Sequence, residues 1–329
     1  MYTSFYKLRA RPFQLTPDYR FFFEAGPHRK AIAYLTYGLS QREGFVVITG
    51  DVGTGKTILV DYLFSKLQGE DFITGKVITT LLGADNLLRM VADAFGIECD
   101  KDDKATVLKK VTSFLIGAHQ RNCRPLLIID EVQNLSKASL EELRMLSNYQ
   151  LRELPLLQTF LVGQTQFRQT MASGGLEQLG QRIIASHHLR PLNAEETRHY
   201  IEHRLHHVGW QDDPRVTEGA FALVFTETGG VPRRINLLFD RLLLFCFLEE
   251  RHEIDEPVLG AVLEDMREEG LPSVLDRPQE TRIPDRLATD RFAAAYAPTR
   301  DGPSSSATEI EALSVRVAEL EQLLKERTG

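Results

Sequence analysis

The sequence predicts an α/β fold in which helices cover both faces of a mostly parallel sheet, followed by a smaller helical domain. Short apolar runs typical of buried strands alternate with helical patterns as far as about residue 190. After Pro191 the strand pattern stops, and helical segments follow one another. A glycine-rich turn after the first strand, and a later strand that ends in two acids, fit the same α/β pattern.

Residues 1–43 are predicted to form an aromatic, proline-containing segment that ends in a helix over 27–41. We expect the aromatic cluster Tyr19–Phe23 to pack against the core, rather than to stack on adenine or on a partner. The α/β domain is expected to span 44–190. Its strands are predicted at 44–50, 76–81, 124–131, 156–164 and near 186–190, and its helices up to about 67, near 85–95 with Asp85 as cap, at 103–121 and at 137–148.

Residues 191–269 are predicted to form a small all-helical lid domain. Asn193 and Glu196 form a capping box that opens its first helix, which runs to about 208. Residues 270–308 carry scattered proline, arginine and serine without periodicity, so we expect a disordered linker. Residues 309–329 repeat apolar side chains at heptad spacing and predict a short helix, which either docks a partner or frays. The other lid helices are predicted at 217–228, 232–250 and 256–268.

The composition argues against several classes of protein. A formal charge of −7 and a pI of about 5.8 are not those of a strongly basic nucleic-acid-binding protein. The chain has no run of 18 apolar residues and its first residues do not resemble a signal peptide, so we expect no membrane span. Cys99, Cys123 and Cys246 lie far apart, which indicates thiols in a reducing compartment. We therefore expect a cytoplasmic protein.

The turn after the first strand has the sequence Gly50-x4-Gly55-Lys56-Thr57, which is the pattern of a phosphate-binding P-loop. Glycines let backbone N–H groups turn toward phosphates, and the following helix adds its positive N-terminal dipole. Lys56 would reach the β- and γ-phosphates, and the Thr57 hydroxyl would bind Mg²⁺. The residues predicted to contact the nucleotide are Gly50, Asp51, Val52, Gly53, Thr54, Gly55, Lys56, Thr57 and Ile58.

Two acids at the end of the third strand predict hydrolysis. The buried run LLIIDE ends in Asp130 and Glu131, and acids at such a position are costly unless they face a metal site. Asp130 would position Mg²⁺, and Glu131 would act as the general base on the attacking water. The NKxD pattern of guanine-binding proteins is absent, which leaves adenine as the expected base and ATP as the nucleotide.

Three further polar residues are candidates for the same site. Gln164 directly follows the fourth strand and would touch the γ-phosphate or the attacking water, unless it is an ordinary loop residue. Arg182 lies between the fourth and fifth strands, and Arg233 begins a lid helix. An arginine from a neighbouring subunit or a separate domain can neutralise transition-state charge and report the nucleotide state. A surface charge for Arg182 and a structural salt bridge for Arg233 remain the alternatives, with Arg168 and Arg234 as weaker candidates.

This set of motifs resembles an AAA+ ATPase over residues 1 to about 268. The phrase PFQLTPD, the helix ending YGL, the P-loop, IDEVQNLSKASLEELRMLSN and FLVGQTQF resemble secretion ATPases of the general-secretion-pathway A type. The sequence of these motifs is most similar to the subfamily found with exosortase and PEP-CTERM loci, which serve exopolysaccharide and envelope biogenesis. The resemblance implies an AAA+ fold with a five-stranded sheet in the order 5-1-4-3-2, ATP hydrolysis and a ring-like homo-oligomer. It also implies that Arg182 is the arginine finger and Arg233 the sensor-2 arginine.

Three functions follow from these patterns. The first is an ATPase that drives or regulates envelope export or exopolysaccharide machinery through protein partners at the inner face of the membrane. The second is a DNA-binding AAA+ regulator of the transposition type, and the third is an assembly scaffold gated by ATP. Secretion members carry a transmembrane segment and a peptidoglycan-binding domain after the ATPase, and residues 270–329 resemble neither, so we expect a soluble partner. Residues 1–263 carry a net charge of only about −2, a poor surface for DNA.

Overall fold

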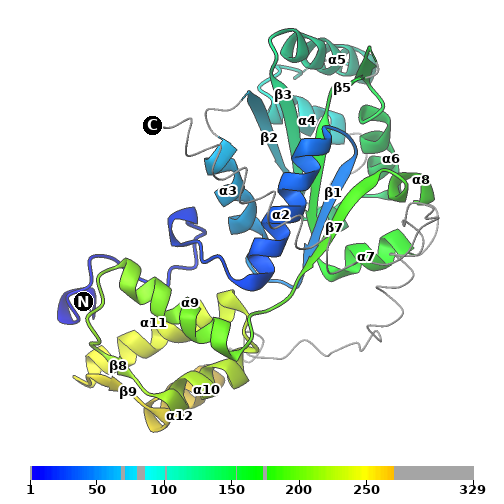
Figure 1. The fold of residues 1–329 in the computed structure, drawn as a ribbon. Helices are drawn as coiled ribbons and strands as arrows, with labels where there is room; N and C mark the ends of the chain where they lie inside the picture. The colour runs from blue at the N-terminus through cyan, green and yellow to red at the C-terminus, as the bar shows by residue number, and fades with distance from the viewer. Residues whose placement is uncertain are drawn as a thin grey trace, which may run out of the picture. The chain divides into compact units, whose positions relative to one another are not determined.

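A computed structural model of the protein describes residues 2–67, 71–79, 86–100, 102–152, 154–172 and 176–269 (Figure 1). The predicted linker and heptad helix, and the predicted helix cap Asp85, lie outside these residues. The predicted domain boundaries stay predictions.

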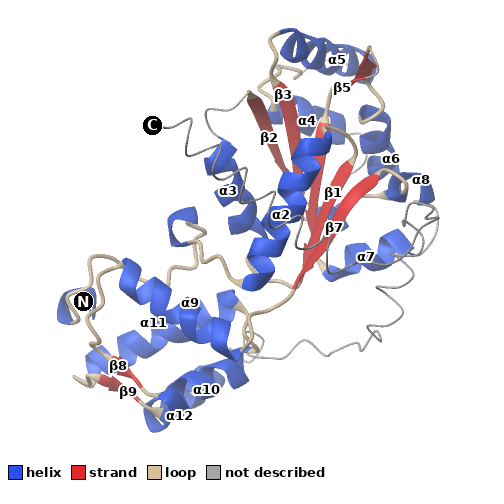
Figure 2. Ribbon diagram, viewed as in Figure 1, coloured by secondary structure: helices blue, strands red, loops and turns tan. Residues whose placement is uncertain are grey.

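Five parallel strands form the central sheet, drawn in red in Figure 2. Their order is β2-β3-β6-β1-β7, which is the predicted order 5-1-4-3-2 read in the opposite direction. The prediction of the fold class is thereby confirmed. The strands are β1 (Phe45–Gly50), β2 (Phe72–Ile78), β3 (Arg124–Asp130), β6 (Gln158–Gly163) and β7 (Ile183–Leu189).

Both faces of the sheet are buried, since every residue of β1 and β6 and all but the first residue of β3 are buried. Alternate residues of β1, such as Val46 and Val47, belong to two different hydrophobic clusters. One face packs against α2 (Gly26–Gln41) and α3 (Lys56–Leu67). The other face packs against α4 (Leu87–Ala94), α5 (Lys104–Gln120), α6 (Lys137–Leu146), α7 (Thr165–Ala172) and α8 (Glu177–Gly180).

The two edge strands start earlier than predicted. β2 was expected at 76–81 and spans 72–78, and β7 was expected near 186–190 and spans 183–189. Edge strands are only half buried, so polar residues interrupt the apolar run from which their limits were predicted. A small hairpin of β4 (Gln150–Leu151) and β5 (Leu154–Pro155) was not predicted, because strands of two residues leave no periodic signal.

The lid contains the four predicted helices. A capping box between Asn193 and Glu196 opens α9, as predicted. The lid also contains a short parallel bridge between β8 (Arg215–Val216) and β9 (Glu253–Ile254), which the sequence did not predict. The helices are α9 (Ala194–His207), α10 (Glu218–Thr228), α11 (Pro232–Leu248) and α12 (Glu256–Glu268).

The N-terminal segment packs against the rest of the chain, as expected for its aromatic cluster. It begins with α1 (Tyr2–Phe5) and contains the 3₁₀ turn η1 (Tyr19–Phe21). Phe21 is part of the hydrophobic core of the lid, and its neighbour Phe22 is part of the core between α2, α3 and the sheet. Two adjacent aromatic residues thus connect the two cores.

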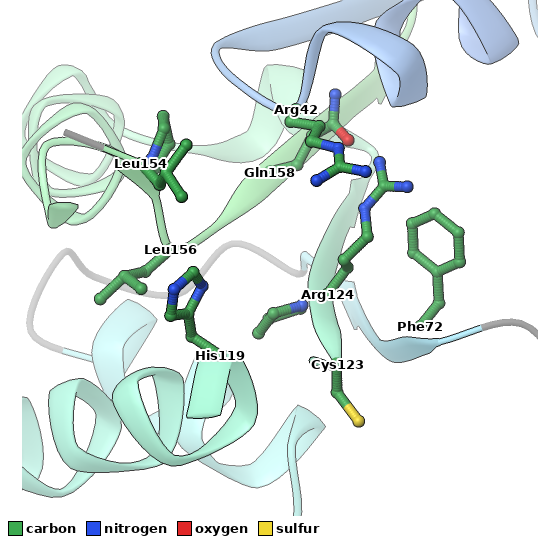
Figure 3. A pocket seen from close by; sticks show the side chains of 10 residues that line it. Arg42, Phe72, His119, Cys123, Arg124, Leu154, Leu156 and Gln158 are labelled. Atoms are coloured by element: carbon green, nitrogen blue, oxygen red, sulfur yellow. The ribbon is translucent and has the colours of Figure 1, made fainter. Parts of the chain in front are cut away.

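A small pocket of about 70 Å³ lies at the end of the sheet where β2, β3 and β6 begin. Figure 3 shows the side chains that line it. Phe72, Arg124 and Gln158, the first residues of these strands, line it. The P-loop follows the last residue of β1. Because the strands are parallel, this pocket lies at the end of the sheet where the strands begin, and the predicted phosphate site lies at the end where they finish.

Candidate nucleotide-binding site

The predicted P-loop joins the end of β1 to the start of α3, which begins at Lys56. Gly53 and Gly55 have φ angles of 85° and 98°, a region that other residues rarely adopt. A Cβ atom on Gly50 would lie 2.6 Å from the carbonyl oxygen of Leu189. The loop therefore needs glycine at all three positions, for its conformation or for its close approach to β7.

Lys56 is buried and forms no direct ion pair among the residues described. Its side chain is 6% exposed, and Nζ donates to the carbonyl oxygens of Gly50 and Asp51, both at 2.9 Å. Burial lowers the pKa of the Lys56 amine. A cation held only by carbonyl oxygens at the start of a helix is well suited to an anion such as a phosphate.

Asp130 is the negative counterpart. It is 5% exposed at the end of β3 and accepts hydrogen bonds from two neutral donors, the Thr57 hydroxyl at 3.0 Å and the Glu131 amide at 2.9 Å. Burial raises the pKa of this carboxyl group. A buried carboxylate beside a hydroxyl favours a hard cation, and Mg²⁺ is usually bound by one or two carboxylates, phosphates and water. In the described part of the chain, no three His, Cys, Asp or Glu side chains converge on a metal position.

Glu131 has a left-handed backbone conformation, with φ 56° and ψ 40°, which is uncommon for a residue other than glycine. The Thr79 hydroxyl holds this backbone by donating to the Glu131 carbonyl oxygen at 2.6 Å. Glu131 Oε2 accepts hydrogen bonds from Gln164 Nε2 at 3.0 Å and from Gln133 Nε2. The structure thus brings Glu131 and Gln164, both predicted to belong to the site, into direct contact.

Four contacts in this region involve residues that sequence reasoning missed. Gln133 and Thr79 contact Glu131, as described above. The Thr165 hydroxyl donates to Asp51 Oδ1 at 2.8 Å, and His28 Nε2 lies 3.3 Å from the Thr54 carbonyl oxygen. The sequence offered only a weak signal for Gln133 and Thr165, which adjoin predicted site residues. Thr79 is 52 residues from its partner Glu131 in the chain, and His28 is 26 residues from its partner Thr54.

The two predicted arginines occupy different places. The Arg233 amide donates to the Gly53 carbonyl oxygen at 3.2 Å, and its side chain is exposed with no ion-pair partner in the described residues. Arg182 directly precedes the first residue of β7, so it lies at the end of the sheet opposite the P-loop. Its Nη1 donates a hydrogen bond to Ser147 Oγ at 3.0 Å. Arg233 therefore adjoins the P-loop of its own chain, whereas Arg182 does not. Of the remaining predicted contacts, Val52 is exposed and Ile58 packs against the core beside α2.

Residues 39–171 match the family model of the AAA domain. Over 255 residues, the chain is 34% identical to General secretion pathway protein A of Aeromonas hydrophila, a match that covers 77% of this chain and 46% of that protein. The chain thus spans about half the length of this curated relative. Among the described residues, no helix combines the length and apolar character that crossing a membrane requires.

Solved structures support the same fold. The Aeropyrum pernix ORC1 protein, solved in complex with DNA, has a TM-score of 0.60 at 13% identity, and the match covers 96% of this chain and 88% of that one. Cdc6p of Pyrobaculum aerophilum has the same score and identity, over 94% and 88%. At such identities these likenesses show the fold alone. The chain therefore has the α/β P-loop fold of AAA proteins, with an AAA domain over residues 39–171 and a sequence similar to that of General secretion pathway protein A.

Proposed function

We propose that this chain binds ATP with Mg²⁺ and hydrolyses it. The observation that carries the proposal is the contact between Thr57 Oγ1 and Asp130 Oδ2 at 3.0 Å, directly beside Glu131. A P-loop hydroxyl and a buried carboxylate there form a pair of hard oxygen ligands for Mg²⁺. The carboxylate of Glu131 follows in the chain and serves as the general base.

Each residue has a distinct role in this proposal. Lys56 and the backbone amides of the loop bind the phosphates, with Mg²⁺, when bound, neutralising phosphate charge. Glu131 takes a proton from a water molecule whose oxygen forms a bond to the γ-phosphorus. The bond from that phosphorus to the bridging oxygen breaks, and ADP leaves with the bonding electron pair. Gln164 orients the water or the γ-phosphate.

The arginines complete the site in an oligomer. Arg233 begins α11 of the lid, so it links nucleotide binding to the position of that helix as a sensor. Arg182 lies away from the P-loop of its own chain, so it acts as the finger in the site of a neighbouring copy. This assignment requires a homo-oligomer, which we propose to be ring-like.

The biological process is proposed from similarity. The relative named General secretion pathway protein A supports a role in secretion, and the resemblance to exosortase-associated ATPases narrows this to envelope export or exopolysaccharide biogenesis. We propose that the chain acts in the cytoplasm at the inner face of the membrane, where it drives or regulates such machinery through a protein partner.

Two measurements test this function. We expect Mg²⁺-dependent ATP turnover that Lys56→Ala abolishes together with ATP binding, whereas Lys109→Ala, an exposed lysine on α5, leaves both unchanged. The partner is sought by affinity purification of full-length Glu131→Gln held in ATP. Recovery of envelope or export proteins supports the proposed process. Recovery of DNA without such proteins contradicts it and favours the transposition-type regulator.

A further inference from the structure

Gln133 lies in the 3₁₀ turn η3 (Val132–Asn134), which directly follows Glu131. This turn approaches the end of β6 closely. A Cβ atom on Gly163 would lie 2.6 Å from Val132 Cγ1 and 2.9 Å from Gln133 Oε1. The absence of a side chain at Gly163 therefore allows the Gln133 amide to enter the space between Glu131 and Gln164.

The orientation of the Gln133 amide follows from its backbone partner. The Gln164 backbone N–H can only donate, and it lies 2.9 Å from Gln133 Oε1. The amide oxygen must therefore face Gln164, so Nε2 faces Glu131 Oε2, with which it forms a hydrogen bond. One side chain thus binds the carboxylate of Glu131 and the backbone of Gln164 at once.

The two oxygens of Glu131 are in different situations. Oε2 accepts hydrogen bonds from Gln133 Nε2 and Gln164 Nε2. Oε1 has no hydrogen-bond partner within the described ranges, and the side chain is half-buried. Two amides therefore fix one carboxylate oxygen and leave the other able to accept a proton.

We propose that Gln133 is a positioning residue for ATP hydrolysis, which fixes Glu131 relative to Gln164 so that Glu131 Oε1 meets the attacking water. The inference rests on the proposed function. Gln133 acts through Glu131 and does not touch the nucleotide, so its loss slows the chemical step and leaves ATP binding intact. Because Gln133 contacts both residues, a displacement of Gln164 also moves Glu131.

The test compares full-length variants in steady-state ATP hydrolysis and in ATP-binding titrations. Gln133→Leu removes both hydrogen bonds, and a misplaced base is expected to lower kcat by about 10- to 100-fold. Gln133→Glu has the same shape and keeps an acceptor for the Gln164 N–H, but it turns a like charge toward Glu131, so kcat falls at least as far. Gln169→Leu, an exposed glutamine on α7, serves as the matched control and keeps wild-type kcat.

A double variant separates positioning from a general effect on the fold. Gln133 and Gln164 hold the same oxygen of Glu131, so Gln133→Leu and Gln164→Leu together should lower kcat by less than the product of their separate effects. A wild-type kcat in folded Gln133→Leu and Gln133→Glu overturns the inference, as does a parallel loss of ATP affinity. Absence of turnover in the wild-type protein itself overturns the proposed function instead.

Discussion

Thr57 Oγ1 donates a hydrogen bond to Asp130 Oδ2 at 3.0 Å, although 73 residues separate the two in the chain. Thr57 lies in the first turn of α3 and Asp130 is the last residue of β3, on the next strand but one from β1. The loop proposed to bind phosphate and the strand that carries the acids are thereby joined through a position suited to Mg²⁺.

The first prediction concerns this pair. Thr57→Ala removes one proposed metal ligand and keeps the buried carboxylate, so the Mg²⁺ concentration needed for half-maximal ATP turnover should rise by about tenfold or more. The measurement is ATP turnover as a function of Mg²⁺ concentration. Thr112→Ala on α5 is the matched control and should keep the wild-type Mg²⁺ dependence. An unchanged dependence in Thr57→Ala would argue against this metal position.

The second prediction concerns Gly53, where the P-loop meets the lid. Its φ of 85° suits glycine, and an added Cβ would lie 2.7 Å from Arg233 Cβ. Gly53→Ala should therefore lower the free energy of unfolding by about 1–3 kcal/mol and weaken ATP binding. Urea unfolding measures the first effect. Gly260→Ala on α12, where an added Cβ meets no atom within 4 Å, should instead stabilise the fold by about 0.5–1 kcal/mol.

The third prediction tests the finger in trans. Arg182→Ala keeps Glu131 but lacks the proposed finger, and Glu131→Gln keeps Arg182 but lacks the proposed base. Each alone should hydrolyse ATP slowly, with Arg182→Ala reduced by about a thousandfold if its arginine is fully used. A mixture should regain turnover, because one copy supplies Arg182 to the intact Glu131 of its neighbour. A mixture no faster than the sum of its parts would show that Arg182 does not act across subunits.

The fourth prediction is a dependence of stability on pH. His28 is 4% exposed beside the P-loop, and burial lowers its pKa from 6.5 to about 4. Between these values the unfolded chain binds a proton that the folded chain does not. Stability is therefore complete above about pH 6.5 and decreases as the pH falls to about 4, by up to roughly 3 kcal/mol from this residue.

The measurement for His28 is urea unfolding at several pH values between 7.5 and 4.5. His28→Gln removes the titrating group and keeps an amide donor for the Thr54 carbonyl, so its stability should fall less on acidification than that of the wild type. Burial also lowers the pKa values of His187 and His203. These two residues therefore maintain part of the dependence of stability on pH in His28→Gln. An unchanged slope in His28→Gln would refute the prediction.

The central strands could be predicted from the sequence because they are buried on both faces and so read as continuous apolar runs. The P-loop follows β1 and the two acids lie at the end of β3, so the positions of these motifs could be predicted together with the strands. Gln164 was placed correctly after β6 for the same reason. The edge strands β2 and β7 were misplaced by several residues, because half-exposed strands mix polar and apolar side chains.

The network around Glu131 could not be predicted in the same way. Gln133 reaches Gln164 only because β6 ends in a glycine that lets the two segments approach. Thr79 meets Glu131 because β2 and β3 are paired in a register that places Ile78 beside Asp130. Such contacts depend on register and on close approach, which neither periodicity nor local motifs determine.

The central claim, that Glu131 is the base of an ATPase, is tested most directly by ATP turnover and ATP affinity measured on the same samples of wild-type and Glu131→Gln protein. The account predicts Mg²⁺-dependent turnover in the wild type, reduced by at least about a hundredfold in Glu131→Gln, with ATP affinity retained. Glu264→Gln, an exposed glutamate on α12, should match the wild type. Undiminished turnover in Glu131→Gln, or a wild-type protein that binds ATP without hydrolysing it, would contradict the account.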